Sequence, residues 1–159
     1  MIGLVALYYN IKRTPKQQLW VAHQYNQTVL VNTANKKLTF YYSDSLSQGA
    51  NLVNDYRRYY PQQKIDFQPI ANAYHINGVS LLLIDGPWVL DLEEIPEGYW
   101  ILQKNAKANL ARLLQKAKPK KIIIDGSNSP YYRDRWIKTL KAHNIPYHIT
   151  ATSGAYYLF

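Results

Sequence analysis

Chemistry in this chain of 159 residues would have to come from histidines and acidic residues, because it contains no cysteine. The four histidines are His23, His75, His143 and His148. No two of them have the H-x-H or H-x-x-x-H spacing of a local zinc motif. The absence of cysteine also excludes a disulfide framework and a thiolate metal site. A zinc site would have to be assembled from residues far apart in the sequence.

Four aspartates are well placed for chemistry, namely Asp85, Asp91, Asp125 and Asp134. Asp91 and Asp125 lie at or just past the ends of expected strands, where sites of α/β proteins gather. Aspartates at such positions also cap turns. The sequence has no G-x-S-x-G elbow, Walker loop or dinucleotide fingerprint. A metal-dependent nuclease or hydrolase built from Asp85, Asp91, Asp125 and a distant histidine stays open as an alternative.

The basic residues are concentrated at the C-terminal end. The chain has 19 Lys and Arg against 10 Asp and Glu, a formal charge of +9. Residues 1–102 carry 8 basic and 8 acidic residues, so the whole excess lies in residues 103–159, with 11 basic and 2 acidic residues. Such a block favours a polyanionic partner, either nucleic acid or an anionic membrane surface, although lysine-rich helices also serve as plain solvated faces.

The first half of the chain is expected to be mainly strands. The strand segments are 4–11, 19–24, 28–32, 38–42, 66–76, 79–84 and 88–92, with turns at Asn26-Gln27, Asn35-Lys36 and Asn77-Gly78. Apolar residues at steps of three and four predict an amphipathic helix over 46–60, which Pro61 ends.

The last third alternates between strands and helices. Strands are expected at 99–102, 120–124, 146–150 and 155–158, and helices at 106–117 and 130–143. Pro130 suits a first helical position, and Asn144 suits the left-handed residue after a helix. This alternation predicts an α/β domain with mixed sheets and about three helices outside them.

From Asn77 onward the sequence resembles one family. The segment NGVSLLLIDGPWVLDL and, more specifically, PKKIIIDGSNSP, IPYH and the closing SGAY are similar to the C-terminal soluble domain of ComEC-type DNA-uptake channel proteins. The resemblance covers nearly the whole chain. It implies a reduced metallo-β-lactamase-like αββα sandwich, a single domain over residues 1–159 and an origin as the C-terminal part of a larger membrane protein.

The resemblance also implies that the metal site is degenerate. The family's H-x-H-x-D-H motif falls on SDSLSQ, so the ligand positions become Ser43, Ser45, Ser47 and Gln48. Its later H-H-G-S element falls near residues 103–106, where Lys104 brings a positive charge, and Asp91 is the one candidate bridging carboxylate. Hydroxyls and an amide cannot replace imidazoles and carboxylates as ligands of Zn²⁺ or Mn²⁺. We therefore expect no catalytic residues, no metal and no cofactor.

A basic surface without a metal indicates handling of DNA rather than cleavage. If the two C-terminal helices lie side by side, they project basic residues to one side. The expected nucleic-acid-binding residues are Lys104, Lys107, Arg112, Lys116, Lys120, Lys121, Arg133, Arg135, Lys138 and Lys141. Tyr131, Tyr132 and Trp136 could stack on unpaired bases, whereas Trp136 is also a natural core anchor.

The resemblance implies two partners. One is DNA, single- or double-stranded and bound without sequence specificity; the other is the membrane-channel part of the same full-length protein. It places the protein in the inner membrane, with this domain, soluble as a fragment, on the periplasmic side. No small-molecule substrate is indicated. A protein-interaction module is a further alternative, which a contiguous patch of exposed tyrosines among the 15 in the chain would favour.

Overall fold

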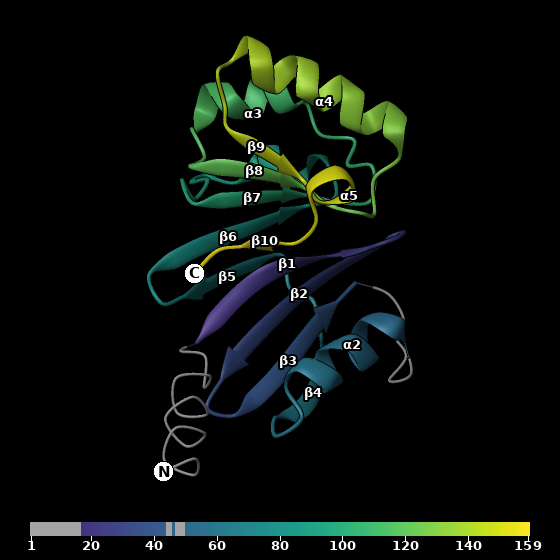
Figure 1. The fold of residues 1–159 in the computed structure, drawn as a ribbon. Coiled ribbons are helices and arrows are strands. Elements are labelled where there is room, and N and C mark those ends of the chain that lie inside the picture. Colours follow the sequence, from purple (N-terminus) through teal and green to yellow (C-terminus); the bar gives the residue numbers. More distant parts are fainter. Residues whose placement is uncertain (1–16, 44–45, 47–49) are drawn as a thin grey trace, which may run out of the picture.

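The protein folds into two five-stranded sheets flanked by helices, as a computed structural model shows (Figure 1). The structure describes residues 17–43, 46 and 50–159. The strand expected at 4–11 lies outside these residues. No helix in the described ranges combines the length and the apolar character needed to cross a bilayer.

Sheet A has the strand order β10-β1-β2-β3-β4. Its strands are β1 (Gln18–Gln24), β2 (Gln27–Ala34), β3 (Lys37–Tyr42), β4 (Lys64–Pro69) and β10 (Tyr156–Tyr157). β1, β2 and β3 form an antiparallel meander, because Asn26, Asn35 and Lys36 adopt the positive φ that tight hairpin turns need. Helix α2 (Asn51–Tyr59) connects β3 to β4, which runs parallel to β3.

Sheet B has the strand order β5-β6-β7-β8-β9. Its strands are β5 (Ala73–Ile76), β6 (Val79–Ile84), β7 (Tyr99–Leu102), β8 (Lys121–Ile124) and β9 (Tyr147–Ile149). β5 and β6 pair across Asn77-Gly78, whose φ values are 51° and 74°. β6 to β9 are parallel, so each needs a crossover. The crossovers carry the 3-10 helix η1 (Pro87–Asp91), α3 (Leu110–Lys116) and α4 (Pro130–Ala142).

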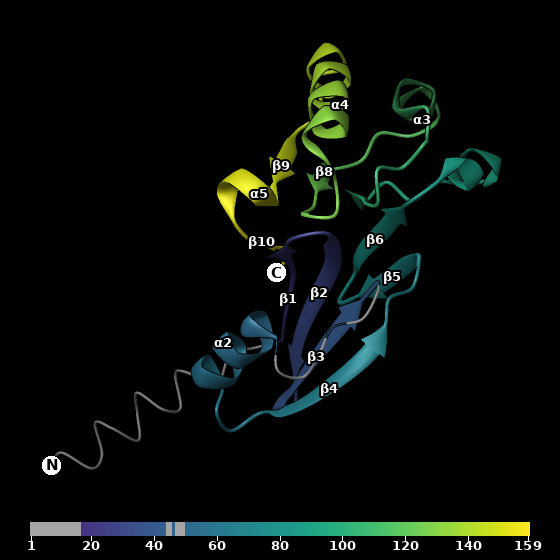
Figure 2. The ribbon, with the colours of Figure 1, turned by 90° about the vertical axis from the view of Figure 1, so that its right-hand side faces the viewer.

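Side chains that alternate along the strands pack against different neighbours and so join the two sheets and the helices outside them into four layers. On β1, Leu19 and Val21 pack against sheet B, whereas Trp20 and Ala22 face α2. On β8, Ile123 joins the core between the sheets, while its neighbours Ile122 and Ile124 pack under α3 and α4. The order is therefore α2, sheet A, sheet B, then α3 with α4, and Figure 2 shows the helices at opposite ends of this stack.

This architecture confirms the predicted α/β class with mixed sheets, and it fits the reduced αββα sandwich. The three helices of seven or more residues among the described ranges are α2, α3 and α4. The closer likeness to metallo-β-lactamases stays a prediction, because the layer order alone is no evidence of common descent.

Two predicted elements were wrong, and a third, the helix expected at 106–117, begins later than predicted. The segment 66–76, expected as one stretch of strand structure, is divided between β4 in sheet A and β5 in sheet B, with the chain passing between the sheets at 70–72. The strand expected at 88–92 is instead the 3-10 helix η1, which begins at Pro87 and buries its own residue Val89. The segment 106–109 lies outside α3, because Asn109 caps that helix by accepting a hydrogen bond from the Arg112 amide. The four-residue helix α5 (Thr150–Ser153) was not predicted.

Candidate nucleic-acid interface

Polar side chains gather where the parallel strands β7 and β8 end, at Leu102 and Ile124. We call this group the edge cluster; it contains Thr28, Ser43, Lys104, Asn105, Asp125, Ser127 and Asn128. Asp125 follows β8 directly and is fully buried. Its Oδ1 atom accepts hydrogen bonds from the Ser127 amide at 3.0 Å and from Asn128 Nδ2 at 3.0 Å, and it also accepts one from the Ser127 hydroxyl. Carboxyl ends of parallel strands meet at one edge, which explains the convergence.

The edge cluster joins the two sheets. The Lys104 amide donates to Ser127 Oγ at 2.8 Å, and the Thr28 hydroxyl of sheet A donates to the same oxygen at 3.3 Å. Gly126 lies directly on the β1–β2 turn, because a Cβ atom there would stand 2.2 Å from the Gln24 carbonyl oxygen. The Gly126 carbonyl also accepts from the Asn26 amide at 3.0 Å. The loop after β8 is thus held against sheet A.

Burial raises the pKa of the Asp125 carboxyl from 3.8 to about 6. Hydrogen bonds from Ser127, the nearby Thr28 hydroxyl and the charge of Lys104 oppose this rise only in part. The second oxygen, Oδ2, is buried and accepts no hydrogen bond of good geometry from a described residue. A carboxylate here is therefore costly, and the carboxyl stays protonated to a higher pH than an exposed aspartate would.

The structure brings together two of the positions that the resemblance assigns to the degenerate metal site. Lys104 Nζ donates to the Ser43 carbonyl oxygen at 3.4 Å, and Ser43 Oγ accepts from the Thr28 amide at 3.2 Å. Ser45, Ser47 and Gln48 lie outside the described residues. The expected positive charge of Lys104 therefore lies beside Ser43.

The remaining acidic candidates have other surroundings, and Asp134 is exposed on α4. Asp91 is exposed at the end of η1, seven residues past the end of β6, and Asp85 accepts a hydrogen bond from Trp88 Nε1 at 2.7 Å. Within residues 17–43, 46 and 50–159, no group of three or more His, Asp or Glu side chains is close enough to hold a metal ion.

The histidines also lie apart from one another. His23 lies beside the loop after β8, and its Nδ1 atom is 3.2 Å from Thr150 Oγ1. His75 pairs with Ser80, His148 with the Gly154 carbonyl, and His143 follows α4 in sequence. The described part of the chain thus offers no assembled site for the nuclease alternative.

Six of the ten predicted nucleic-acid-binding residues lie on α3 and α4. They are Arg112 and Lys116 on α3, and Arg133, Arg135, Lys138 and Lys141 on α4. Both helices cover the outer face of sheet B through Leu113, Leu114 and Leu140 (Figure 1). These six residues and Lys107, which precedes α3, are seven residues that we call the helical face. All of them are exposed except Arg133, which is half-buried.

The other three predicted residues lie at the two ends of sheet B. Lys104 belongs to the edge cluster, beyond the carboxyl end of β7. Lys120 and Lys121 lie at the opposite end, where their ammonium groups stand 5.3 and 4.8 Å from the ring centres of Tyr99 and Tyr156. The ten residues are therefore distributed over both ends of sheet B and the two helices that cover it.

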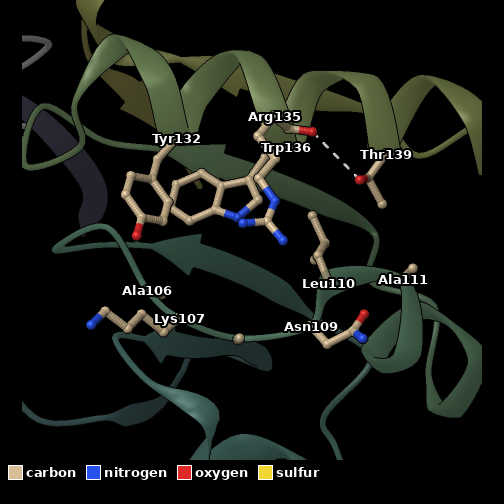
Figure 3. Close-up of a pocket in the computed structure, with 10 residues that line it drawn as sticks. Ala106, Lys107, Asn109, Leu110, Ala111, Tyr132, Arg135, Trp136 and Thr139 are labelled. Carbon is tan, nitrogen blue, oxygen red and sulfur yellow. Dashed lines mark hydrogen bonds between the residues drawn. The ribbon is translucent and has the colours of Figure 1, made fainter.

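A groove of about 530 Å³ opens between α4 and the segment leading into α3. Figure 3 shows Tyr132, Arg135 and Trp136 extending from α4 on one side, with Lys107 and Asn109 on the other. None of its lining residues is acidic. The sequence analysis did not predict the groove, although it named Tyr132, Trp136, Lys107 and Arg135 separately. The reason is that it placed residues 106–109 in a helix, whereas in the structure they precede α3.

The aromatic residues of α4 divide into core and surface. Trp136 is 3% exposed and packs with Leu110 and Leu140, so it anchors the helix. Tyr131 is 70% exposed, and Tyr132 stands between these two, with its ring centre 5.5 Å from that of Tyr131 and 5.7 Å from that of Trp136. Only the tyrosines are available for stacking on a partner.

Comparison with known proteins gives one match. The family model of the ComEC C-terminal domain matches residues 19–159. Neither a curated protein nor a solved structure matches the chain significantly. The matched range contains both sheets, the edge cluster and the helical face. The chain therefore belongs to the ComEC C-terminal domain family, which ties it to the membrane proteins of competence DNA uptake.

Proposed function

We propose that this chain is a non-catalytic domain that contacts DNA through the helical face. The distribution of charge carries the proposal, since the entire excess of +9 lies in residues 103–159 and six of its cations are fixed on two neighbouring helices. Phosphate contacts of this kind supply most of the affinity of non-specific DNA binding.

Few acids compete for these cations. The ion pairs among the described residues are Lys37 with Asp66 and Arg58 with Asp55, both in the first half of the chain. Asp134 is the one acidic residue on α4. Because the helical face keeps its charge, release of counterions from DNA would drive binding.

The chemistry of the edge cluster supports a non-catalytic role. Its described side chains offer hydroxyls, amides and one buried carboxyl whose pKa is raised by burial, together with the Lys104 ammonium beside Ser43. A divalent metal needs imidazole or carboxylate ligands, and a neighbouring ammonium repels it. We infer that this edge holds the two sheets together and performs no hydrolysis.

Family membership suggests the setting in which the domain works. We propose that residues 1–159 act as one domain joined to a membrane channel, on the periplasmic side of the inner membrane, where incoming DNA would meet the helical face. Packing of the domain on the channel itself is the alternative. The most exposed large hydrophobic residues of the described ranges are Tyr25, Tyr59, Tyr131 and Tyr157, which lie in the β1–β2 turn, on α2, on α4 and on β10.

The test is binding to fluorescein-labelled oligonucleotides, single- and double-stranded, measured by anisotropy between 20 and 200 mM salt (roughly the range in which phosphate contacts are screened). We expect the double variant Arg135→Glu with Lys138→Glu to weaken binding at low salt by about tenfold or more. We also expect it to reduce the slope of log K against log salt by about 2, since each phosphate contact contributes about 0.9 for duplex DNA.

A matched variant separates a local contact from total charge. Arg57→Glu with Arg58→Glu changes the net charge equally on α2, at the opposite end of the layer stack. Equal loss of affinity in both variants, or binding that does not change with salt, would refute the helical face as the interface. Cleavage of the oligonucleotide with added Mn²⁺ that stops on chelation would refute the non-catalytic assignment and favour the nuclease alternative.

A further inference from the structure

The groove between α4 and residues 106–109 has the lining of a nucleotide site. Its volume, about 530 Å³, falls within the roughly 300–1,000 Å³ of small-ligand sites. Its walls combine an aromatic ring, an apolar floor and two cations, which match the base, the sugar and the phosphate of a nucleotide. We propose that this groove receives one unpaired nucleotide of single-stranded DNA, an inference that rests on the proposed contact with DNA.

The two cations that line the groove favour a polymeric anion, rather than an apolar protein segment, as its occupant. Lys107 and Arg135 are both exposed and line the groove, and Figure 3 shows Arg135 extending from α4 and Lys107 on the facing segment. No acidic residue lines the groove. Both side chains are positively charged, so they attract a phosphate of DNA to the groove.

The aromatic residues favour an unpaired base. Tyr132 lines the groove and is half-buried, so one part of its ring remains available. Tyr131, 70% exposed and in edge contact with Tyr132, offers a second ring outside the groove. Aromatic rings stack on any base, whereas bases of a duplex are stacked inside the helix and cannot enter a groove without unpairing. The groove therefore predicts preference for single-stranded DNA.

The floor sets the depth to which a base can enter. Ala106 and Leu110 are buried, and Trp136 is 3% exposed beneath Tyr132. Small side chains at Ala108 and Ala111 leave the space open, and Ala108 is only half-buried. Replacing Ala108 with tryptophan would fill this space without changing the charge of the helical face.

The experiment compares Ala108→Trp with the original chain on oligo-dT and on a duplex of equal length. We expect single-stranded affinity to fall by at least about fivefold, the loss of one base stack, while duplex affinity changes by less than about twofold. Ala151→Trp, an exposed position on α5 outside the groove, is the matched control. Circular dichroism of each variant shows whether it is folded.

A second measurement needs no variant. A single 2-aminopurine within oligo-dT should lose fluorescence on binding to the original chain, because the base stacks on an aromatic ring in the groove. Unchanged fluorescence, or equal effects of Ala108→Trp on single strands and duplex, would overturn the groove while leaving the helical face as the DNA contact. Absence of DNA binding by the original chain would overturn both.

Discussion

Asp125 should make this domain less stable as the pH rises, and Asp125→Asn should remove that effect. The carboxyl is fully buried, and its pKa rises from 3.8 to about 6 on folding. Folding therefore favours the protonated form. The stability that this group contributes is complete below pH 4 and is lost as the pH passes through about 6.

The size of the effect follows from the two pKa values. A tenfold change in proton affinity is worth about 1.36 kcal/mol, so the step from 3.8 to about 6 corresponds to roughly 3 kcal/mol. This amount is large beside the roughly 5–15 kcal/mol of a typical domain. Asparagine keeps the oxygen that accepts from the Ser127 amide and from Asn128, and it cannot ionise.

The assay is urea unfolding followed by tryptophan fluorescence at several pH values between about 4 and 8. Trp20 and Trp100 are fully buried, so their emission reports loss of both sheets. The difference between the free energies of unfolding of the original chain and Asp125→Asn should change by roughly 3 kcal/mol across this range. Asp134→Asn, an exposed acid on α4, is the control. Parallel pH profiles for the original chain and Asp125→Asn would refute the reasoning.

Two further predictions concern the elements that position the interface. Gly126→Ala should destabilise the domain by about 1–3 kcal/mol, because the new Cβ would meet the Gln24 carbonyl oxygen at 2.2 Å. Gly78→Ala is the comparison, because φ there is +74° and no atom lies near the new Cβ; it should lower the free energy of unfolding by about 1 kcal/mol in the same urea assay. Equal destabilisation by the two variants would argue against a clash between residue 126 and the Gln24 carbonyl. Asn109→Ala should lower the free energy of unfolding by about 1 kcal/mol, because it removes the cap of α3. The comparison is Asn51→Ala, at an exposed position in the first turn of α2, whose N-cap residue makes no side-chain hydrogen bond. An unchanged urea midpoint for Asn109→Ala would contradict the capping role.

Local patterns predicted most of the individual elements. The β7 and β8 strands are short, nearly continuous apolar runs, and α4 begins at Pro130 and is followed by Asn144 at φ 53°. Patterns of this kind depend only on near neighbours in the chain. The same reasoning failed at 88–92, because an apolar segment after Pro87 packs equally well as a 3-10 turn and sequence alone does not separate the two.

The site was less accessible to such reasoning. Residue types predicted a basic C-terminal third. They did not predict that Lys104 lies at one end of sheet B and Lys120 and Lys121 at the other, because the direction of β7 and β8 decides where these residues lie. The groove depends on where α3 begins, and a single cap residue, Asn109, sets that.

Composition and spacing by themselves determined the α/β class, the location of the charge and the absence of cysteine chemistry, and the resemblance of particular segments indicated the ComEC family. The tertiary structure decided which of these residues meet. It placed Ser43 against Lys104, buried Asp125 between the sheets and opened the groove beside Tyr132. The reason is that charge and periodicity belong to the chain, whereas contacts between residues such as Thr28 and Ser127, 99 positions apart, exist only once both sheets have packed.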